Sequence, residues 1–467
     1  MPEGEIHTEV LVIGGGPGGI TFSRYLKKLK PQIEITMLRS EKHSMVYCAI
    51  PYAIEGLFDP HKTFKKNELV TDVGVHLIQR AVKEVDLKKK RVVDETGDIY
   101  TSDIIFIATG AVPVLPPIPG ADAANIYTVK TQHDMESIIE KIHSGAKRAV
   151  VVGAGAIGIE QAQAYRSQGL DVYLIDMVSR VLPAMIDEDM ADVLYETLRG
   201  KGIRLMLSTY AKGIEKEGEY AKRILLSNGE NIDLDAERDF ICFAVGMKPD
   251  VELFEGQGLE MDKDGIVVDS RMRTSISGVY AVGDCCQYIS AIDGMPVGGK
   301  LATNAVPMAK TAACVAAGID DEYPGFFNGA AACVYELRIG STGFTSEVAQ
   351  KRGIDTVAGW GETTTLFPMM PGAGKLRVKI IADVRDLQVI GGQVISILSA
   401  ADKVDVITLA IQWRLTLKGL STLSYSAQPW QSFMPARSAI VQACENALDN
   451  FAAKSRQFDF SNLLECV

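Results

Sequence analysis

Residues 9–19, EVLVIGGGPGG, and residues 149–158, AVVVGAGAIG, repeat one pattern in two distant parts of the chain. In each stretch a short run rich in β-branched residues leads directly into G-x-G-x-x-G. The glycines allow a tight turn and let a pyrophosphate reach the first N–H groups of the next helix, where the helix dipole favours negative charge. The pattern predicts two Rossmann-like nucleotide sites. Their glycines are Gly14, Gly16 and Gly19 in the first site and Gly153, Gly155 and Gly158 in the second.

The residue that ends the second strand of each unit distinguishes the two sites. The run VYLID ends in Asp176, 18 residues after Gly158. An acid at this position bonds a ribose 2′-hydroxyl and repels a 2′-phosphate, so the second site is expected to prefer NADH to NADPH. In the first unit Arg39 stands where an acid is expected. Two alternatives stay open: Glu41 takes the ribose role, or Arg39 stacks on an adenine.

Length and composition set outer limits. The chain has 467 residues, and at about 150 residues per domain this length predicts roughly three domains. Hydrophobic residues make up 47% and charged residues 23%, which is typical of a globular chain. The eight cysteines are scattered and form no CxxC or His-rich zinc pattern. We therefore predict no metal site and no disulfide scaffold.

The charge balance bears on partners and location. The formal net charge is −11, and an acidic chain repels nucleic acid, so no nucleic-acid partner is expected. No basic patch favours an anionic membrane, and no apolar run approaches the roughly 20 residues of a membrane span. We therefore expect no membrane association. The first residues lack the charged and apolar regions of a signal peptide, so a cytoplasmic protein with reduced thiols is expected.

Further apolar runs place other elements. Residues 103–110, DIIFIATG, predict a strand that ends in a turn of small residues. Residues 274–284, TSISGVYAVGD, predict a second strand that ends in Asp284. The stretch 326–467 carries no nucleotide motif and has a mixed α/β pattern. Its expected elements are strands near 376–382 and 388–397 and a helix near 402–416.

These motifs together resemble one family. Two Rossmann units, ATG at 108–110 and TSISGVYAVGD at 274–284 are similar to the two-dinucleotide flavoprotein reductases, the pyridine nucleotide–disulfide oxidoreductases. The resemblance implies an α/β fold with two Rossmann-like dinucleotide-binding domains and a C-terminal α+β dimerisation domain. The implied domains are a discontinuous FAD-binding domain at 1–112 and 250–325, an NAD(H)-binding domain at 113–249 and the dimerisation domain at 326–467.

The same resemblance implies the cofactors and the assembly. The first unit then binds FAD, the second binds NAD(H), and the C-terminal domain makes a homodimer. Thr109, Gly110 and Asp284 are expected to contact FAD, with Asp284 at the ribityl chain of the flavin. Glu41 is kept as the candidate for the adenosine ribose of FAD.

Residues 43–56, HSMVYCAIPYAIEG, carry one cysteine, Cys48, and no second cysteine four residues away. This lone cysteine resembles the single-cysteine subgroup, which includes coenzyme A disulfide reductases, polysulfide and persulfide reductases, NADH peroxidases and water-forming NADH oxidases. One cysteine cannot form an internal disulfide, so its oxidised form is a mixed disulfide, a persulfide or a sulfenic acid. Attack on sulfur needs the thiolate, so nearby positive charge or a helix N-terminus is expected.

Histidines narrow the choice of electron acceptor. All six lie at or before residue 143, so the C-terminal His that glutathione-reductase-like members use as acid–base catalyst is absent. NADH peroxidases and oxidases of the subgroup carry a His inside the first glycine motif, where this chain has Pro17. His43 is either a surface residue or a substitute. The pattern argues against a sulfenic-acid peroxidase.

Coenzyme A disulfide reductases offer a partial match. Their C-terminal domain supplies tyrosines to the partner subunit's active site, and Tyr425 is either such a catalytic tyrosine or a packed aromatic at the dimer interface. A second expected tyrosine is replaced by Met369 and Met370, and apolar methionines enlarge and dry a pocket. Arg24 and Lys27 either meet the phosphates of coenzyme A or form the solvated face of the first helix.

Three other cysteines are weaker candidates. Cys285 and Cys286 either bind a soft metal as a vicinal pair or pack the flavin domain as small buried residues. Packing is the favoured interpretation. Cys466, next to the last residue, is interpreted as a free thiol.

The sequence thus predicts a homodimeric, FAD-dependent NADH oxidoreductase that reduces a small sulfur substrate through Cys48. The expected acceptors are coenzyme A disulfide, coenzyme A persulfide and polysulfide, with coenzyme A as substrate or as a bound mixed disulfide. Three alternatives remain open. They are an NADH oxidase or peroxidase, an NADH-dependent reductase of a protein electron carrier such as rubredoxin, and a flavin-bearing redox sensor that is not an enzyme.

Overall fold

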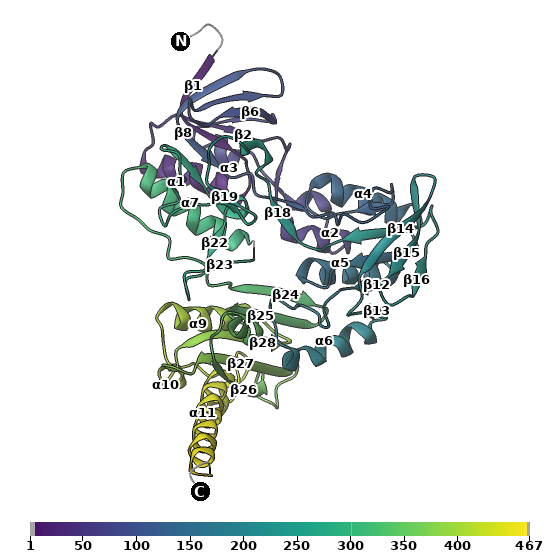
Figure 1. Cartoon of the computed structure of the whole chain (residues 1–467), viewed down its shortest axis with the longest axis vertical. Helices are drawn as coiled ribbons and strands as arrows, with labels where there is room; N and C mark the ends of the chain where they lie inside the picture. The colour runs from purple at the N-terminus through teal and green to yellow at the C-terminus, as the bar shows by residue number, and fades with distance from the viewer. Residues whose placement is uncertain (1–4, 300, 465–467) are drawn as a thin grey trace. The chain divides into compact units, whose positions relative to one another are not determined.

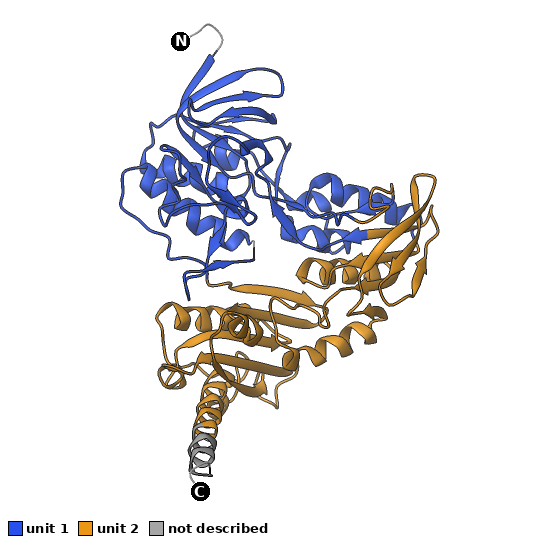
Figure 2. Ribbon diagram, viewed as in Figure 1, with its two compact units in different colours: residues 1–117, 125–146, 242–326 blue, residues 118–124, 147–241, 327–467 orange. Residues whose placement is uncertain are grey.

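The chain folds into two compact units of mixed α/β structure (Figure 1, Figure 2). The structure is a computed structural model and describes residues 5–299 and 301–464. Unit 1 comprises residues 1–117, 125–146 and 242–326. Unit 2 comprises residues 118–124, 147–241 and 327–467. We keep the three-domain boundaries expected from the sequence as a proposal.

A mostly parallel sheet forms the core of unit 1. Its order is β5-β2-β1-β8-β7-β6, and β21 also pairs with β8. The strands β5, β2, β1, β8 and β21 are parallel, and the β7–β6 hairpin is antiparallel. The apolar run that the sequence places here is fully buried at Val10, Leu11 and Val12. The bounds are β1 (Glu5–Ile13), β2 (Ile35–Leu38), β5 (Val75–Ile78), β6 (Val82–Asp86), β7 (Arg91–Asp94), β8 (Ile99–Ile107) and β21 (Val279–Ala281).

Two helices, α1 (Pro17–Leu29) and α7 (Ala302–Ala316), pack against each other in unit 1 (Figure 1). Proline suits the first position of α1, because the N–H that it lacks has no partner inside a helix there. The apolar face of α1 buries Phe22, whose ring stacks on Phe106 of β8 with 3.6 Å between centroids. This contact holds α1 against the sheet.

Short elements complete unit 1. The segment around Cys48 runs through a two-residue strand, a single 3-10 turn and a short helix, and a second strand returns to pair with the first. These are β3 (Ser44–Met45), η1 (Tyr47–Ala49), α2 (Ile50–Ile54), η2 (Pro60–Thr63), β4 (Phe64–Lys65) and α3 (Glu68–Thr71). Further along the chain lie β9 (Ala111–Pro113), β10 (Ile126–Tyr127), α4 (Gln132–His143), β18 (Met247–Pro249), β19 (Met261–Asp262), β20 (Gly265–Ile266), η4 (Gly283–Cys285), β22 (Tyr288–Ile289) and β23 (Pro296–Val297).

Unit 2 contains the second Rossmann-like fold. The strands β11, β12 and β13 are parallel, and their apolar residues Val150, Val151 and Leu174 are fully buried. An antiparallel β14-β15-β16 sheet follows. The bounds are β11 (Arg148–Val152), α5 (Ala156–Ser167), β12 (Asp171–Ile175), α6 (Glu188–Gly200), β13 (Ile203–Met206), β14 (Ala211–Glu217), β15 (Tyr220–Leu226), β16 (Asn231–Asp233) and β17 (Asp239–Phe243).

The rest of unit 2 is built on an antiparallel sheet of order β24-β25-β28-β27-β26, and α11 packs along β26 (Figure 1). The strands and helix expected from the sequence appear as β27, β28 and α9. The predicted α/β fold class, with two Rossmann-like folds and a mixed C-terminal region, is confirmed. The bounds are β24 (Ala330–Val334), β25 (Leu337–Gly343), α8 (Ser346–Lys351), β26 (Thr356–Thr364), β27 (Lys375–Asp383), β28 (Val389–Ser396), α9 (Ala401–Gln412), α10 (Leu417–Ser421) and α11 (Ala439–Leu464).

Candidate active site

The first glycine turn (residues 14–19) connects β1 to α1. Gly14 has a φ of +106°, and its N–H donates to the Leu38 carbonyl at 2.9 Å. A Cβ at this position would lie 2.2 Å from the Ala108 carbonyl oxygen, so the turn requires glycine. Gly16 is the N-cap of α1 without a side-chain cap, and nothing lies within 4 Å of the place of its Cβ. The uncapped N–H groups and this space fit a pyrophosphate.

The second glycine turn (residues 153–158) repeats this frame in unit 2. Gly153 has a φ of +114°, and its N–H donates to the Ile175 carbonyl at 2.8 Å. Gly155 is the N-cap of α5 without a side-chain cap, and it also has open space around the place of its Cβ. Gly158 is buried in the first turn of α5, as Gly19 is in α1. This turn therefore fits the pyrophosphate of a second nucleotide.

Arg39 and Asp176 occupy equivalent positions in the two frames. Each is the first residue after the second strand, and each donates its N–H to the next parallel strand, Arg39 to Ile78 at 3.0 Å and Asp176 to Met206 at 3.1 Å. The Asp176 carboxylate accepts from the Ala154 N–H at 2.5 Å. This bond holds the carboxylate at the glycine turn, where a nucleotide ribose is expected.

Arg39 is 4% exposed, and its side chain lies over Gly15. A Cβ on Gly15 would be 2.4 Å from Cδ of Arg39, so the arginine needs a glycine there. The guanidinium donates to the carbonyls of Glu41 and Lys42, both at 2.8 Å, and to Asn67 Oδ1 at 2.7 Å. Burial lowers the pKa of Arg39, while the charge of Glu41 opposes this shift. Arg39 thus organises the loop that carries Glu41.

Glu41 contacts the residue next to the expected redox cysteine. The Tyr47 hydroxyl donates to Glu41 Oε2 at 2.9 Å, and the Lys130 ammonium lies 4.8 Å from the centroid of the Tyr47 ring. Cys48 is exposed on the 3-10 turn η1, which runs directly into α2. The predicted thiol is therefore accessible, and a cation lies beside its neighbour. His43 stacks on Phe64 with 5.1 Å between centroids.

The ends of β8 and β21 bring the ATG turn and Asp284 to the same edge of the unit 1 sheet. The two strands are parallel neighbours, with Ala281 opposite Ile107. Thr109 Oγ1 donates to the Asp250 carbonyl at 2.6 Å, and the Gly110 carbonyl accepts from the Asp250 N–H at 2.9 Å. This edge is the one to which the first glycine turn belongs, because Ile13 lies opposite Ile107. The predicted FAD residues are thus brought together.

Asp284 and the two cysteines after it are packed into unit 1. The Tyr288 hydroxyl donates to Asp284 Oδ1 at 3.1 Å, and burial followed by the Asp284 charge raises the pKa of Tyr288. Cys285 and Cys286 are fully buried, with 3.9 Å between their sulfurs. The hydrogen bond from Cys286 lowers the pKa of Cys285 against the effect of burial. In residues 5–299 and 301–464 no group of three or more His, Cys, Asp or Glu is placed to hold a metal; Cys466 lies outside these residues.

Tyr425 lies in a loop cluster of unit 2. Its hydroxyl donates to the Pro435 carbonyl, and its ring lies 5.4 Å from that of Phe433. The Phe367 N–H donates to the Pro429 carbonyl at 3.2 Å, which joins the loop of Met369 to the loop of Tyr425. Several large apolar side chains of these loops are exposed. They are Tyr425, at 39%, Met369, at 70%, Trp430, at 57%, and Met434, at 38%.

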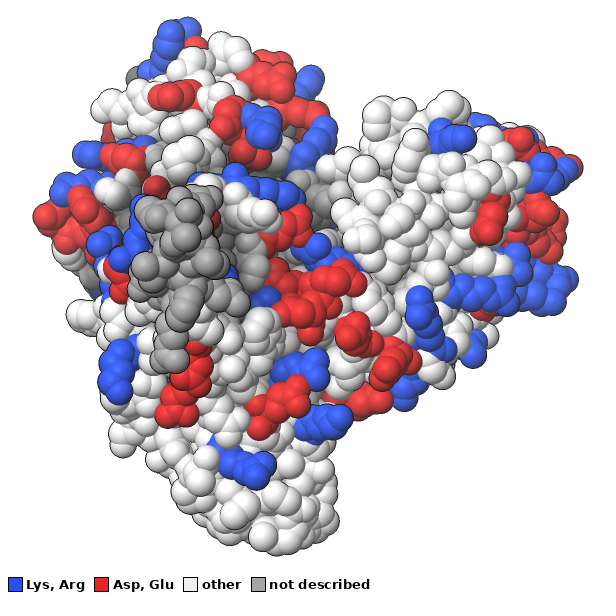
Figure 3. All heavy atoms as spheres, turned by 60° about the horizontal axis from the view of Figure 1, so that its bottom comes forward, with Lys and Arg blue, Asp and Glu red and all other residues white. Residues whose placement is uncertain are grey.

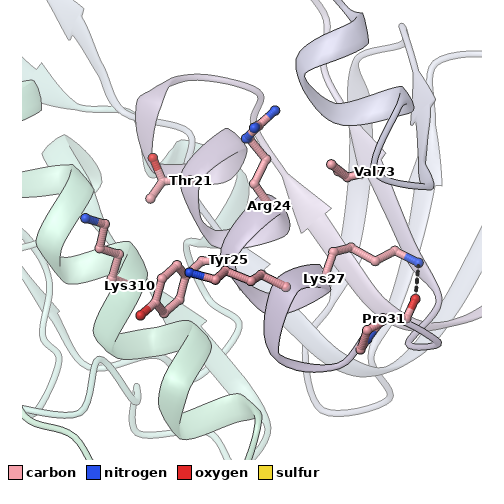
Figure 4. Close-up of a pocket in the computed structure, with 8 residues that line it drawn as sticks. Thr21, Arg24, Tyr25, Lys27, Pro31, Val73 and Lys310 are labelled. Atoms are coloured by element: carbon pink, nitrogen blue, oxygen red, sulfur yellow. Dashed lines mark hydrogen bonds between the residues drawn. The ribbon is translucent and has the colours of Figure 1, made fainter.

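A basic pocket of about 510 Å³ lies between α1 and α7 of unit 1 (Figure 4). Arg24, Lys27 and Lys28 come from α1, and Figure 4 shows Lys310 on the neighbouring α7. Arg24 donates to the Leu69 carbonyl and Lys27 to the Pro31 carbonyl at 3.4 Å. The remaining lining residues are Thr21, Tyr25, Pro31 and Val73. Four cations and no carboxylate are among the lining residues, and in Figure 4 the head groups of Arg24, Lys27 and Lys310 point in different directions.

Charge elsewhere is mixed. On the face that Figure 3 draws, acidic and basic side chains are interspersed. None of the helices in the described part of the chain is both long and apolar enough to cross a membrane. Four residues of these sites carry no signal in the sequence: Tyr47, Lys130, Tyr288 and Lys310. Lys130 and Lys310 meet partners that are distant in the chain, and the contacts of Tyr47 and Tyr288 depend on how their hydroxyls pack.

The two glycine turns and the exposed thiol define a two-nucleotide oxidoreductase. A family model for pyridine nucleotide-disulphide oxidoreductases matches residues 8–309, and a model for the dimerisation domain of the same family matches residues 330–437. The chain therefore belongs to the pyridine nucleotide-disulphide oxidoreductase family. This assignment confirms the predicted class of enzyme and its cofactors, FAD and NAD(H).

Individual relatives fall into two groups. The chain is 31% identical to an NADH oxidase of Methanocaldococcus jannaschii over 95% of this chain and 99% of the relative. It is 30% identical to an NAD(P)H coenzyme A polysulfide/persulfide reductase of Pyrococcus horikoshii over 83% of this chain and 87% of the relative. Among solved structures, an NAD-dependent persulfide reductase from A. fulgidus has a TM-score of 0.89 at 28% identity, covering 96% of this chain and 84% of that one.

Proposed function

We propose that the chain uses NADH to reduce a small disulfide, persulfide or polysulfide through Cys48, in the manner of a coenzyme A disulfide reductase. The observation that carries this proposal is the exposed Cys48 thiol on a turn of the unit that also holds the first glycine turn. FAD, when bound at the first glycine turn, carries two electrons from NADH to sulfur. The NADH preference is assigned to Asp176.

The sulfur chemistry begins at Cys48. Its thiolate attacks one sulfur of R–S–S–R′, so that a Cys48–S–S–R bond forms and R′–S⁻ leaves. Two electrons from NADH then cleave this mixed disulfide and regenerate the Cys48 thiolate. The overall change is NADH + H⁺ + RSSR′ → NAD⁺ + RSH + R′SH.

Coenzyme A is the proposed thiol carrier. The pocket between α1 and α7 presents Arg24, Lys27, Lys28 and Lys310, and its cationic lining suits the phosphates of a nucleotide tail. A coenzyme A persulfide relative at 30% identity supports the same substrate class.

A homodimer is the proposed assembly. The dimerisation model covers the loops of Tyr425 and Met369, and their exposed apolar side chains suit a second copy of this chain. Tyr425 is proposed to face the partner's active site from there. The cytoplasmic location expected from the sequence is part of this proposal.

An NADH oxidase is the second candidate, and the 31% identical NADH oxidase relative favours it. Reduction of a protein carrier such as rubredoxin is the third, and it predicts activity that survives Cys48→Ser. The test is anaerobic NADH oxidation with coenzyme A disulfide, coenzyme A persulfide and polysulfide, beside NADH alone in air. Fast anaerobic turnover that disappears in Cys48→Ser supports the proposal. Turnover in air alone favours the oxidase.

A further inference from the structure

The turn that carries Cys48 is anchored on both sides but is itself exposed. Before it, β3 pairs with β4, and the Val46 N–H donates to the Thr63 carbonyl at 2.8 Å. After it, α2 buries Ile50, Pro51, Ala53 and Ile54. The turn η1 between these anchors is only three residues long and has no side-chain cap. The backbone bonds of the turn are local, from the Ala49 N–H to the Val46 carbonyl at 2.9 Å and from the Ile50 N–H to the Tyr47 carbonyl. Side-chain contacts of the turn to the rest of unit 1 can therefore set the position of the thiol.

Tyr47 makes such contacts on two sides. Its hydroxyl donates to Glu41 at 2.9 Å, and its ring lies under the Lys130 ammonium, 4.8 Å from the centroid. The backbone of each partner is held by a hydrogen bond of its own. Arg39 holds the Glu41 carbonyl at 2.8 Å, and the Lys130 N–H donates at 2.9 Å to Asp134, whose carboxylate also closes the capping box of α4.

The surroundings of Tyr47 favour its protonated phenol. Burial raises the pKa of Tyr47, and the charge of Glu41 and the hydrogen bond to it act in the same direction, while Arg39 opposes them. The phenol therefore remains a donor. A hydrogen bond to a carboxylate is stronger than a neutral one, and a cation over an aromatic ring adds attraction.

We propose that Tyr47 is a positioning residue for Cys48, held by Glu41 and Lys130, and that it sets the geometry in which a disulfide approaches the thiol. The inference rests on the proposed function, because the substrate is the disulfide named there. Thiol–disulfide exchange needs the thiolate and both substrate sulfurs nearly in line. A misplacement of about 1 Å can cost up to about a hundredfold in rate, so the position of the turn matters even if the thiol stays exposed.

The test compares the holoenzyme with Tyr47→Phe and with Tyr100→Phe. The control removes a tyrosine–carboxylate hydrogen bond of the same unit, from Tyr100 to Asp94 at 3.1 Å. Each protein is mixed with coenzyme A disulfide without NADH, and mass spectrometry follows the mixed disulfide at Cys48. Iodoacetamide alkylation of Cys48 is measured in parallel, because a small reagent needs no particular approach.

Tyr47→Phe is expected to slow mixed-disulfide formation about tenfold and to change alkylation by less than about twofold. Tyr100→Phe is expected to change neither rate by more than about twofold. A wild type that forms the mixed disulfide at a measurable rate, with an equal rate in Tyr47→Phe, would overturn the inference.

Amide hydrogen exchange over residues 47–49 separates this inference from the proposed function. The exchange is expected to be several-fold faster in Tyr47→Phe than in the wild type and Tyr100→Phe, whatever the substrate. Unchanged exchange would overturn the role of Tyr47. A wild type that forms no mixed disulfide, but whose exchange at 47–49 still responds to Tyr47→Phe, would overturn only the proposed substrate.

Discussion

The two glycine turns share a backbone frame but differ in the side chain beside the expected ribose. Gly14 donates to the last residue of β2 at 2.9 Å, and Gly153 donates to the last residue of β12 at 2.8 Å. The next residue is a buried arginine in unit 1 and an aspartate in unit 2. Arg39 passes over Gly15, whereas the shorter Asp176 accepts from the backbone N–H of Ala154. The same backbone frame thus recurs in both units, and the side chain that lies beside the turn differs between them.

The segments that follow the two second strands also differ. In unit 1 this segment leads through Glu41 to the exposed Cys48. In unit 2 it leads to Asp187, a buried carboxylate at the N-cap of α6 that accepts from Lys379 of β27 at 2.9 Å. The first segment therefore presents an exposed thiol, and the second attaches the nucleotide fold to the C-terminal sheet.

The largest expected effect tests whether sulfur reduction depends on the exposed thiol of unit 1. Cys48→Ser is expected to lower the anaerobic rate of sulfur reduction by at least about a thousandfold, because serine is a far weaker nucleophile toward sulfur. The control is Cys314→Ser, which removes a partly exposed thiol from α7. It should keep the wild-type rate in the same NADH assay. A Cys48→Ser enzyme that remains active would place the chemistry elsewhere.

Glycine substitutions separate folding from phosphate binding within the shared frame. Gly14→Ala is expected to destabilise the protein by about 2–4 kcal/mol, because the new Cβ meets a carbonyl at 2.2 Å and φ is positive. Gly16→Ala should leave the midpoint of urea denaturation unchanged and weaken FAD binding about tenfold, because its Cβ enters the phosphate space. Gly155→Ala should likewise raise the KM for NADH. A lower denaturation midpoint for Gly16→Ala would show that its Cβ clashes in the folded protein.

The difference between Arg39 and Asp176 is tested by comparing NADH with NADPH as the electron donor. Asp176→Ala is expected to reduce the preference for NADH over NADPH by about ten- to a hundredfold, because a charged hydrogen bond to the ribose is lost along with the repulsion of a 2′-phosphate. Steady-state kinetics with both coenzymes measure the ratio. Arg39→Ala should leave that ratio unchanged and accelerate the loss of FAD on dilution. Unchanged selectivity in Asp176→Ala would show that another residue reads the ribose.

The smallest effect concerns the attachment in unit 2. Burial acts to raise the pKa of Asp187, but attraction to Lys379 and the hydrogen bonds outweigh it, so the pKa is lowered in the folded state. Its stabilisation is therefore complete above the unfolded pKa of about 3.9 and is lost as pH falls through the lower folded value. Asp187→Asn should cost about 1–2 kcal/mol at pH 7 by urea denaturation, and the difference from wild type should shrink in acid. Asp402, an exposed carboxylate that pairs with Lys403, serves as the control. Asp402→Asn should lower the free energy of unfolding by less than about 0.5 kcal/mol.

Much of this protein could be predicted from local sequence. Both glycine turns, the ATG turn and Asp284 lie in contiguous motifs that could be recognised from the sequence alone. Gly14 is required by its φ and by the approach of Ala108, and the apolar runs specify strands because they have to be buried. Cys48 could also be recognised from the sequence, because residues 43–56 contain no second cysteine with which it could form an internal disulfide.

Only the tertiary structure decided what Arg39, Tyr47 and Lys130 do. In the sequence, Arg39 is noticed only because an acid is expected at its position. Its role becomes visible in the folded chain, where its guanidinium donates to the carbonyls of Glu41 and Lys42. Lys130 meets Tyr47 across a large separation in the chain, and no periodicity predicts such a pair. The reason is physical: glycine turns and buried strands are dictated by local backbone sterics and hydrophobicity, whereas hydrogen bonds and cation–ring contacts between distant residues exist only after the chain has packed.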